Sequence, residues 1–97
     1  MRTTVADFSK ITCILRGYTA QETRLILEVL KDSGIRSVEI TMNTEGALSM
    51  ISEAVERFGD SLSIGAGTVL TMEQLHDVVA AGADFVLSPV MFTREML

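Results

Sequence analysis

Short apolar runs alternate along the chain with longer stretches in which apolar residues recur every three or four positions. A short run predicts a strand, and the longer period predicts a helix with one buried face. The strands expected from this pattern span residues 11–16, 37–42, 62–69 and 84–88. The helices expected between them span about 20–33, 45–58 and 71–82, and a further helix opens near 93–96.

Capping residues mark the same segments. Thr19 and Thr71 each precede a predicted helix and are followed three positions later by Glu22 and Gln74, respectively. This is the capping-box spacing, in which a hydroxyl and a side-chain oxygen satisfy the first free amides of a helix. The stripes expected to face a core contain Leu25, Ile26, Val29 and Leu30 in the first helix, Leu48, Ile51 and Val55 in the second, and Leu75, Val78 and Val79 in the third.

The alternation of strand and helix indicates a parallel sheet with right-handed crossovers. Strands covered by helices on both sides are usually apolar throughout. In the strand at 37–42, however, Val38 and Ile40 alternate with Glu39 and Thr41. One face suits a helix layer, and the other suits the polar lumen of a barrel near its C-terminal mouth. The pattern therefore favours an α/β fold of the parallel (β/α) TIM-barrel type over an open sheet.

Length limits how much of such a barrel the chain can form. A compact eight-stranded barrel takes about 200 residues, and this chain has 97. We therefore expect residues 1–97 to be one domain, about half of a (β/α)8 barrel with about four strands and three helices. The hydrophobic fraction of 47% is high for so short a chain, because a small domain buries only about 60% of its unfolded surface. The excess indicates apolar surface meant for a missing half or another subunit.

Charge and cysteine content exclude several classes of function. The net charge is −5, with acidic residues spread along the chain, whereas nucleic-acid binding requires a basic surface. No stretch approaches the roughly 18 consecutive apolar residues of a membrane span. Cys13 is the single cysteine, which excludes an internal disulfide and a multi-cysteine metal site and favours a reducing compartment. We expect a cytoplasmic protein without nucleic-acid or membrane partners.

Glu39 is the residue most informative about chemistry. Burying an unpaired carboxylate in a sheet is costly, so such a group either pairs with a cation or has its pKa raised toward neutrality. A raised pKa suits general acid–base catalysis, whereas a salt bridge would make the residue structural. Arg16 ends the first predicted strand at the expected mouth of the barrel. It could bind a carboxylate or phosphate of a ligand, or it could pair with Glu39.

The third and fourth predicted strands end in weaker signals. Residues 65–68 read Gly-Ala-Gly-Thr, where glycine lets a ligand or a neighbouring backbone approach closely and the Thr68 hydroxyl can donate a hydrogen bond. No third glycine opens the next helix, so this is not a dinucleotide fingerprint. Pro89 follows the fourth strand and is more readily explained as shaping a loop. His76 is expected on a solvated helix face, and Cys13 as a small buried hydrophobe.

Four segments taken together are more specific than any one of them. They are Ile14-Leu-Arg-Gly17, Val38-Glu-Ile-Thr41, Ile64-Gly-Ala-Gly-Thr-Val69 and Ala81-Gly-Ala-Asp-Phe-Val-Leu-Ser-Pro89. In this order and spacing the chain resembles the 2-keto-3-deoxy-6-phosphogluconate (KDPG) aldolase family, and the related 4-hydroxy-2-oxoglutarate and 6-phosphogalactonate aldolases share the pattern. The resemblance runs from about Ile11 to Pro89 and covers the first half of a family member.

The resemblance implies a class I aldolase, in which a lysine forms a Schiff base with the substrate ketone and retro-aldol cleavage releases pyruvate and an aldehyde phosphate. The cationic imine is the electron sink, so no metal or other cofactor is implied. Glu39 stands at the position of the family's acid–base glutamate. Arg16 and Thr68 match residues at the pyruvyl end of the site, and Pro89 matches a rim proline. The implied ligand is a phosphorylated keto acid, and full-length members commonly form trimers.

Two departures from the family pattern affect what the chain can do. Asn43 stands where the common pattern has an arginine. The change removes a guanidinium that could bind a carboxylate through two parallel hydrogen bonds. Because the chain is similar here to the 6-phosphogalactonate branch, Asn43 is kept as a substrate-binding candidate. The family's Schiff-base lysine lies on the sixth strand, whereas the lysines here are Lys10, before the first strand, and Lys31, late in the first helix. Neither is placed to be the nucleophile. We therefore expect the isolated chain to be an inactive fragment that needs a complementing C-terminal half.

Two other hypotheses fit the same sequence. A complete small α/β half-barrel could self-associate into a pseudo-barrel and bind a ligand at residues 65–68 without catalysis. Alternatively, the chain could be a barrel half from a different phosphate-sugar enzyme. The Glu-Ile-Thr and Gly-Ala-Gly-Thr segments at this spacing disfavour the second of these hypotheses.

Overall fold

The computed structural model of the chain describes residues 11–89. These residues form four strands and three helices in alternation. The elements are β1 (Thr12–Leu15), α1 (Ala20–Leu30), β2 (Ser37–Thr41), α2 (Ala47–Phe58), β3 (Ser63–Gly67), α3 (Met72–Ala80) and β4 (Phe85–Val86). Each lies within the segment predicted for it, and the helix expected near 93–96 falls outside the described residues.

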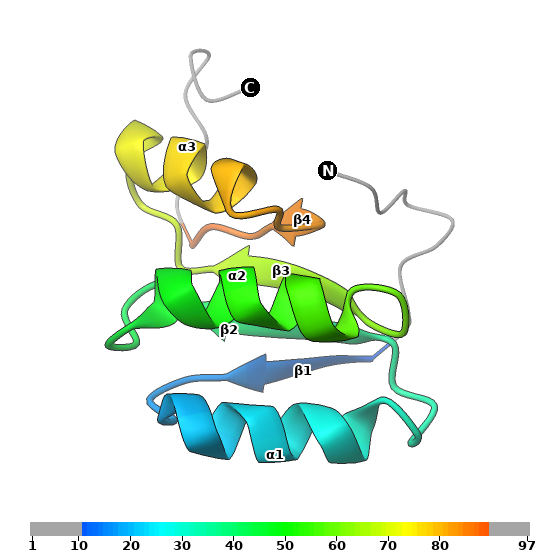
Figure 1. The fold of residues 1–97 in the computed structure, drawn as a ribbon. Coiled ribbons are helices and arrows are strands. Elements are labelled where there is room, and N and C mark those ends of the chain that lie inside the picture. Colours follow the sequence, from blue (N-terminus) through cyan, green and yellow to red (C-terminus); the bar gives the residue numbers. More distant parts are fainter. Residues whose placement is uncertain (1–10, 90–97) are drawn as a thin grey trace.

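All four strands belong to one parallel sheet in the order β1-β2-β3-β4 (Figure 1). A doubly wound sheet reverses its strand order at a switch point, whereas a barrel adds its strands in sequence. The three helices follow one another in the same order, α1 contacting α2 and α2 contacting α3. The predicted half of an α/β barrel is therefore confirmed, and the open doubly wound sheet is ruled out for the described residues.

The hydrophobic core lies between the sheet and the helices. In Figure 1, α2 crosses in front of β2 and β3. Val38, Ile40 and Ile64 of these strands are at most 1% exposed. They pack in one cluster with Leu27 of α1 and Ile51 of α2. Burying a large aliphatic side chain contributes about 1.5–3 kcal/mol, so the helix-facing side of the sheet gives the fold its hydrophobic stabilisation.

The buried face of α1 differs from the stripe expected for it. Leu27 and Leu30 are buried, whereas Leu25 and Val29 are 63% and 71% exposed. Successive helical residues point about 100° apart, so Leu25 and Val29, each two positions from the buried Leu27, lie on the opposite side of the helix. In the same way Val79 of α3 is exposed although its neighbour Val78 is fully buried.

Helix starts follow the predicted caps in α1 and α3. Thr19 accepts from the amide of Glu22, whose carboxylate accepts from the amide of Thr19. At α3 only half of the predicted box forms: Thr71 accepts from the amide of Gln74, whose side-chain oxygen accepts from the amide of Leu70 rather than from that of Thr71. The second helix begins at Ala47 rather than near residue 45, because a turn occupies the residues before it. Within residues 11–89, no helix has the length and apolar character that crossing a bilayer requires.

Candidate active site

The sheet face opposite the helices carries the candidate chemistry. One row across it consists of the register partners Ile14, Glu39, Gly65 and Phe85. Register partners point to the same side of a parallel sheet, and successive residues alternate sides. Because Val38 and Ile40 face the helices, the row that contains Glu39 faces the lumen of the barrel arc. The alternation predicted for residues 37–42 is confirmed.

Two glycines of β3 make room for large side chains on this lumen face. A Cβ built on Gly67 would overlap the carboxylate of Glu39, and a Cβ built on Gly65 would overlap the ring of Phe85. Glu39 pairs in register with Gly65, but its side chain lies over Gly67, two residues further along β3. The sequence suggested that these glycines admit a ligand or a neighbouring backbone. In the fold they admit side chains of the sheet itself.

The Glu39 carboxyl is buried on this face, with 6% of the residue exposed. Burial raises the pKa of Glu39 above its ordinary value of 4.5, because the charged form loses solvation, and the positive charge of Arg16 opposes part of this rise. A carboxyl that holds its proton more tightly than usual can accept and return a proton closer to neutral pH. The direction of this shift is the one that favours acid–base catalysis.

Arg16 and Thr68 meet at the C-terminal ends of β1 and β3. The Nη2 atom of Arg16 donates to Oγ1 of Thr68 at 3.3 Å. Arg16 is exposed, so its guanidinium acts on Glu39 through its charge while remaining open to a ligand. The φ of Thr68 is +55°, a left-handed conformation that costs a β-branched residue about 1–2 kcal/mol. Such strain is most common at functional sites.

Asn43 and Pro89 lie at the same end of the sheet. Asn43 is exposed in the turn after β2, which is closed by the amide of Thr44 donating to the carbonyl of Thr41. Pro89 is exposed just after β4, beside Ser88, whose hydroxyl donates to the carbonyl of Val69. The fold therefore brings all five candidates to one mouth, since the carboxyl ends of parallel strands meet at one edge. They are Arg16, Glu39, Asn43, Thr68 and Pro89.

Sequence reasoning missed two buried hydroxyls beneath this mouth. The Oγ1 atoms of Thr41 and Thr44 are 2.9 Å apart, and both residues are at least 93% buried because their exposed fractions are 0% and 7%. Thr41 alternates onto the same strand face as Glu39, so the pattern of β2 contained a signal for it. Thr44 lies in the turn that follows, and nothing in the sequence pattern marked it.

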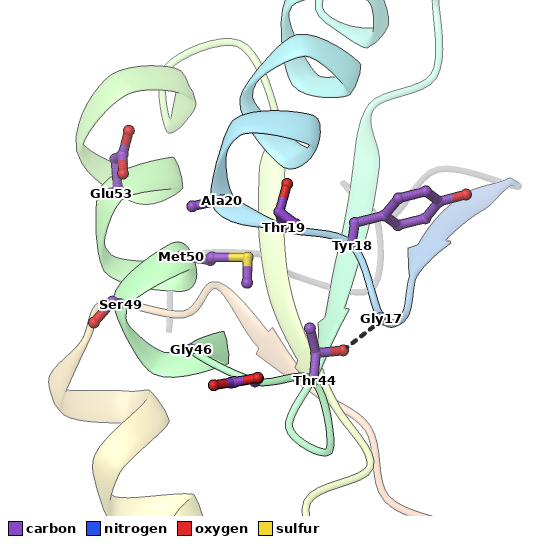
Figure 2. A pocket seen from close by; sticks show the side chains of 10 residues that line it. Gly17, Tyr18, Thr19, Ala20, Thr44, Gly46, Ser49, Met50 and Glu53 are labelled. Atoms are coloured by element: carbon purple, nitrogen blue, oxygen red, sulfur yellow. Dashed lines mark hydrogen bonds between the residues drawn. The ribbon is translucent and has the colours of Figure 1, made fainter.

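A separate pocket of about 380 Å³ lies outside the lumen, between the first turns of α1 and α2 (Figure 2). Its walls include Thr19, Thr44, Ser49 and Met50 but none of Arg16, Glu39 and Thr68. The candidate site is instead the open lumen face, because four strands form an arc that does not close. Figure 2 also shows the Thr44 side chain directed at Gly17.

Lys31 lies far from the candidate site at the C-terminal ends of the strands. It follows α1 at the end opposite the strand mouths, because each helix runs antiparallel to its strand. Its Nζ atom pairs with Oε1 of Glu28 at 2.7 Å, and this hydrogen bond raises the pKa of Lys31. A nucleophilic lysine needs its amine neutral. Lys10 lies outside the described residues, and residues 11–89 contain no metal-binding cluster of His, Cys, Asp and Glu.

Comparisons with known proteins agree with this fold. A family model described as KDPG and KHG aldolase matches residues 4–97. The 2-dehydro-3-deoxy-phosphogluconate aldolase of Pseudoalteromonas atlantica is 44% identical over 72 residues, covering 74% of this chain and 33% of that protein. The 2-dehydro-3-deoxy-6-phosphogalactonate aldolase of Escherichia coli is 34% identical over 79 residues, covering 81% of this chain and 38% of that protein.

Solved structures give the same answer. The KDPG aldolase of Legionella pneumophila, with pyruvate captured as a covalent carbinolamine intermediate, superposes with a TM-score of 0.82 at 37% identity. The match covers 92% of this chain and 42% of that one. This chain thus spans about a third to two fifths of the length of the relatives it matches. By sequence and by fold, the chain belongs to the KDPG and KHG aldolase family.

Proposed function

We propose that this chain forms the acid–base and carboxylate-binding part of a class I aldolase. The enzyme would cleave a 2-keto-3-deoxy-6-phospho sugar acid into pyruvate and an aldehyde phosphate. The observation that carries the proposal is the buried, lumen-facing Glu39 carboxyl with its raised pKa. Arg16 adds a positive charge at the C-terminal end of β1, where barrel enzymes place their active sites.

The Schiff-base lysine comes from outside the 97 residues in this proposal. The ion pair of Lys31 with Glu28 and its raised pKa support this, because a protonated amine does not attack a ketone. The carbinolamine in the Legionella pneumophila relative is the adduct that forms when an amine adds to the pyruvate ketone. We propose that the same chemistry takes place in a barrel that this chain forms together with a C-terminal half.

Glu39 moves protons at two points of the proposed reaction. Loss of water from the carbinolamine needs a proton delivered to the departing hydroxyl group. The resulting carboxylate then accepts the proton of the C4 hydroxyl group as the C3–C4 bond breaks and the aldehyde forms. It returns this proton to the terminal carbon of the enamine, before hydrolysis of the imine releases pyruvate. A single carboxyl with a raised pKa can serve both steps, because it returns a proton that it has accepted.

Asn43 is the proposed specificity residue. An arginine would offer a fork of parallel donors to a carboxylate, whereas asparagine offers one amide group and one carbonyl. With Asn43 exposed at the mouth, we propose a 6-phosphogalactonate-type sugar acid as the preferred substrate. Thr68 is the proposed donor to the pyruvyl group, and Pro89 shapes the rim.

A chimera tests this proposal. Residues 1–97 replace the matching N-terminal part of the Escherichia coli phosphogalactonate aldolase, which supplies the rest of the barrel. We expect the chimera to release pyruvate from 2-keto-3-deoxy-6-phosphogalactonate, as measured by a coupled lactate dehydrogenase assay. A soluble, folded chimera without activity would contradict the assignment of this half as a working part of the site.

Borohydride trapping of the isolated chain is the matched control. Treated with pyruvate and borohydride, the 97-residue chain should gain no mass, whereas the chimera should gain the mass of one reduced pyruvate adduct. An adduct on Lys10 or Lys31 of the isolated chain would contradict the proposal that the lysine comes from elsewhere.

A non-catalytic half-barrel that self-associates is the second candidate, favoured by apolar side chains left in solvent. Ile14 on the lumen face is 56% exposed, and Leu25 and Val29 of α1 are more exposed still. Two copies of a four-stranded arc would supply the eight strands of a closed barrel. Sedimentation should then give a defined dimer whose unfolding midpoint rises with protein concentration, whereas a monomer would exclude this candidate.

A cytoplasmic location stays a prediction from the charge and the single cysteine.

A further inference from the structure

The main chain on both sides of Arg16 is held by two hydroxyls, one at the end of β2 and one in the turn that follows. On one side, the amide of Gly17 donates to Oγ1 of Thr44 at 2.9 Å, as Figure 2 shows. On the other side, Oγ1 of Thr41 donates to the carbonyl of Leu15 at 3.5 Å. The two hydroxyls are 2.9 Å apart and hydrogen-bonded to each other. A continuous series of hydrogen bonds therefore joins the main chain before Arg16 to the main chain after it.

These hydrogen bonds fit one consistent set of donors and acceptors. Either hydroxyl can donate in the bond between the two threonines. When Thr41 donates its hydrogen to the carbonyl of Leu15, Thr44 is the donor in that bond. In that arrangement Thr44 accepts from Gly17 and donates to Thr41 at the same time. Both of its hydrogen-bonding functions are used, and the residue is 7% exposed.

Gly17 has no side chain that could pack against its surroundings. Its φ is +80°, and a Cβ at this position would find nothing within 4 Å. A glycine in open space can adopt many backbone conformations, and the exposed Arg16 comes immediately before it. Without the Thr44 hydroxyl, the main chain next to Arg16 would lose the hydrogen bond that holds it. Only the 3.3 Å bond to Thr68, made at the far end of the side chain, would still orient the arginine.

We propose that Thr44 is a positioning residue that, together with Thr41, clamps the main chain on both sides of Arg16 and so fixes where its guanidinium lies. This inference deepens the proposed function, on which it rests for the role of Arg16 at the pyruvyl end of the site. The clamp lets a ligand meet an arginine that is already in place, which lowers the entropy lost on binding.

The test is a carbon-13 NMR titration of the Glu39 carboxyl in the 97-residue chain, without substrate. The charge of Arg16 lowers the pKa of Glu39, so a released Arg16 should let that pKa rise. Thr44→Val should therefore show a higher Glu39 pKa than the wild type, and its Gly17 amide should exchange about 2- to 10-fold faster because it loses a hydrogen bond. Thr44→Ser keeps the hydroxyl and should restore both values.

Thr71→Val is the matched control, because it removes a threonine hydroxyl that caps α3 and destabilises the fold without touching Arg16. An unchanged Glu39 pKa in Thr44→Val, or an equal rise in Thr71→Val, overturns the proposal. If Thr44→Val does not fold, Thr44→Ala removes the same hydroxyl within a smaller side chain and gives the same two readouts. Neither readout involves substrate, so an inactive chimera would leave this inference standing.

Discussion

Replacing Glu39 by glutamine is expected to lower pyruvate release by the chimera about 10²- to 10⁴-fold, the usual contribution of a general acid–base group. Glutamine keeps the size of the side chain but holds no transferable proton. Binding through Arg16 and Thr68 should persist, so kcat should fall far more than KM changes. The coupled assay measures both constants. A variant with near-normal kcat would remove Glu39 from the proposed mechanism.

The same substitution should stabilise the isolated chain at neutral pH. Because burial raises the pKa of Glu39 above 4.5, the folded state binds its proton more tightly than the unfolded state does. The stability that this protonation provides is complete below about pH 4.5 and is lost as the pH rises through the raised folded value. The urea midpoint of Glu39→Gln should therefore exceed that of the wild type at pH 7, by a margin that shrinks on acidification. A margin independent of pH would argue against a buried carboxyl.

Gly67→Ala should lower the free energy of unfolding by about 1–3 kcal/mol, the usual cost of overpacking. The new methyl group would occupy the place of the Glu39 carboxylate, so one of the two must move. In the chimera the displaced carboxylate should also cost activity. Urea unfolding of the isolated chain measures the first effect, and the coupled assay measures the second.

A double-mutant cycle separates this clash from a general effect of the added methyl group. Glu39→Ala vacates the space that the Gly67→Ala methyl needs, so the two substitutions should be coupled by about 1–2 kcal/mol. Gly65→Ala is the control, because its methyl meets Phe85 rather than Glu39, and Glu39→Ala should not rescue it. Additive losses in the first pair would show that Glu39 does not lie across Gly67.

Much of the fold could be predicted because its signals are local. The capping pair Thr19 and Glu22 needs residues three apart, and the alternation of Val38 with Glu39 needs only neighbours. The order of strands and helices then restricts the topology to a few parallel arrangements. The stripe on α1 was partly wrong because hydrophobicity alone does not say which flank of a helix has a neighbour, and Leu25 and Val29 face solvent.

By itself, the sequence determined the elements, the parallel arc and the edge at which Arg16, Glu39 and Thr68 gather. Only the tertiary structure decided that Gly67 makes room for the Glu39 carboxylate and that Thr44 holds the backbone beside Arg16. The physical reason is range. The period of a pattern places a residue on a face, whereas these contacts join residues 27 or more positions apart and depend on the register in which neighbouring strands pair.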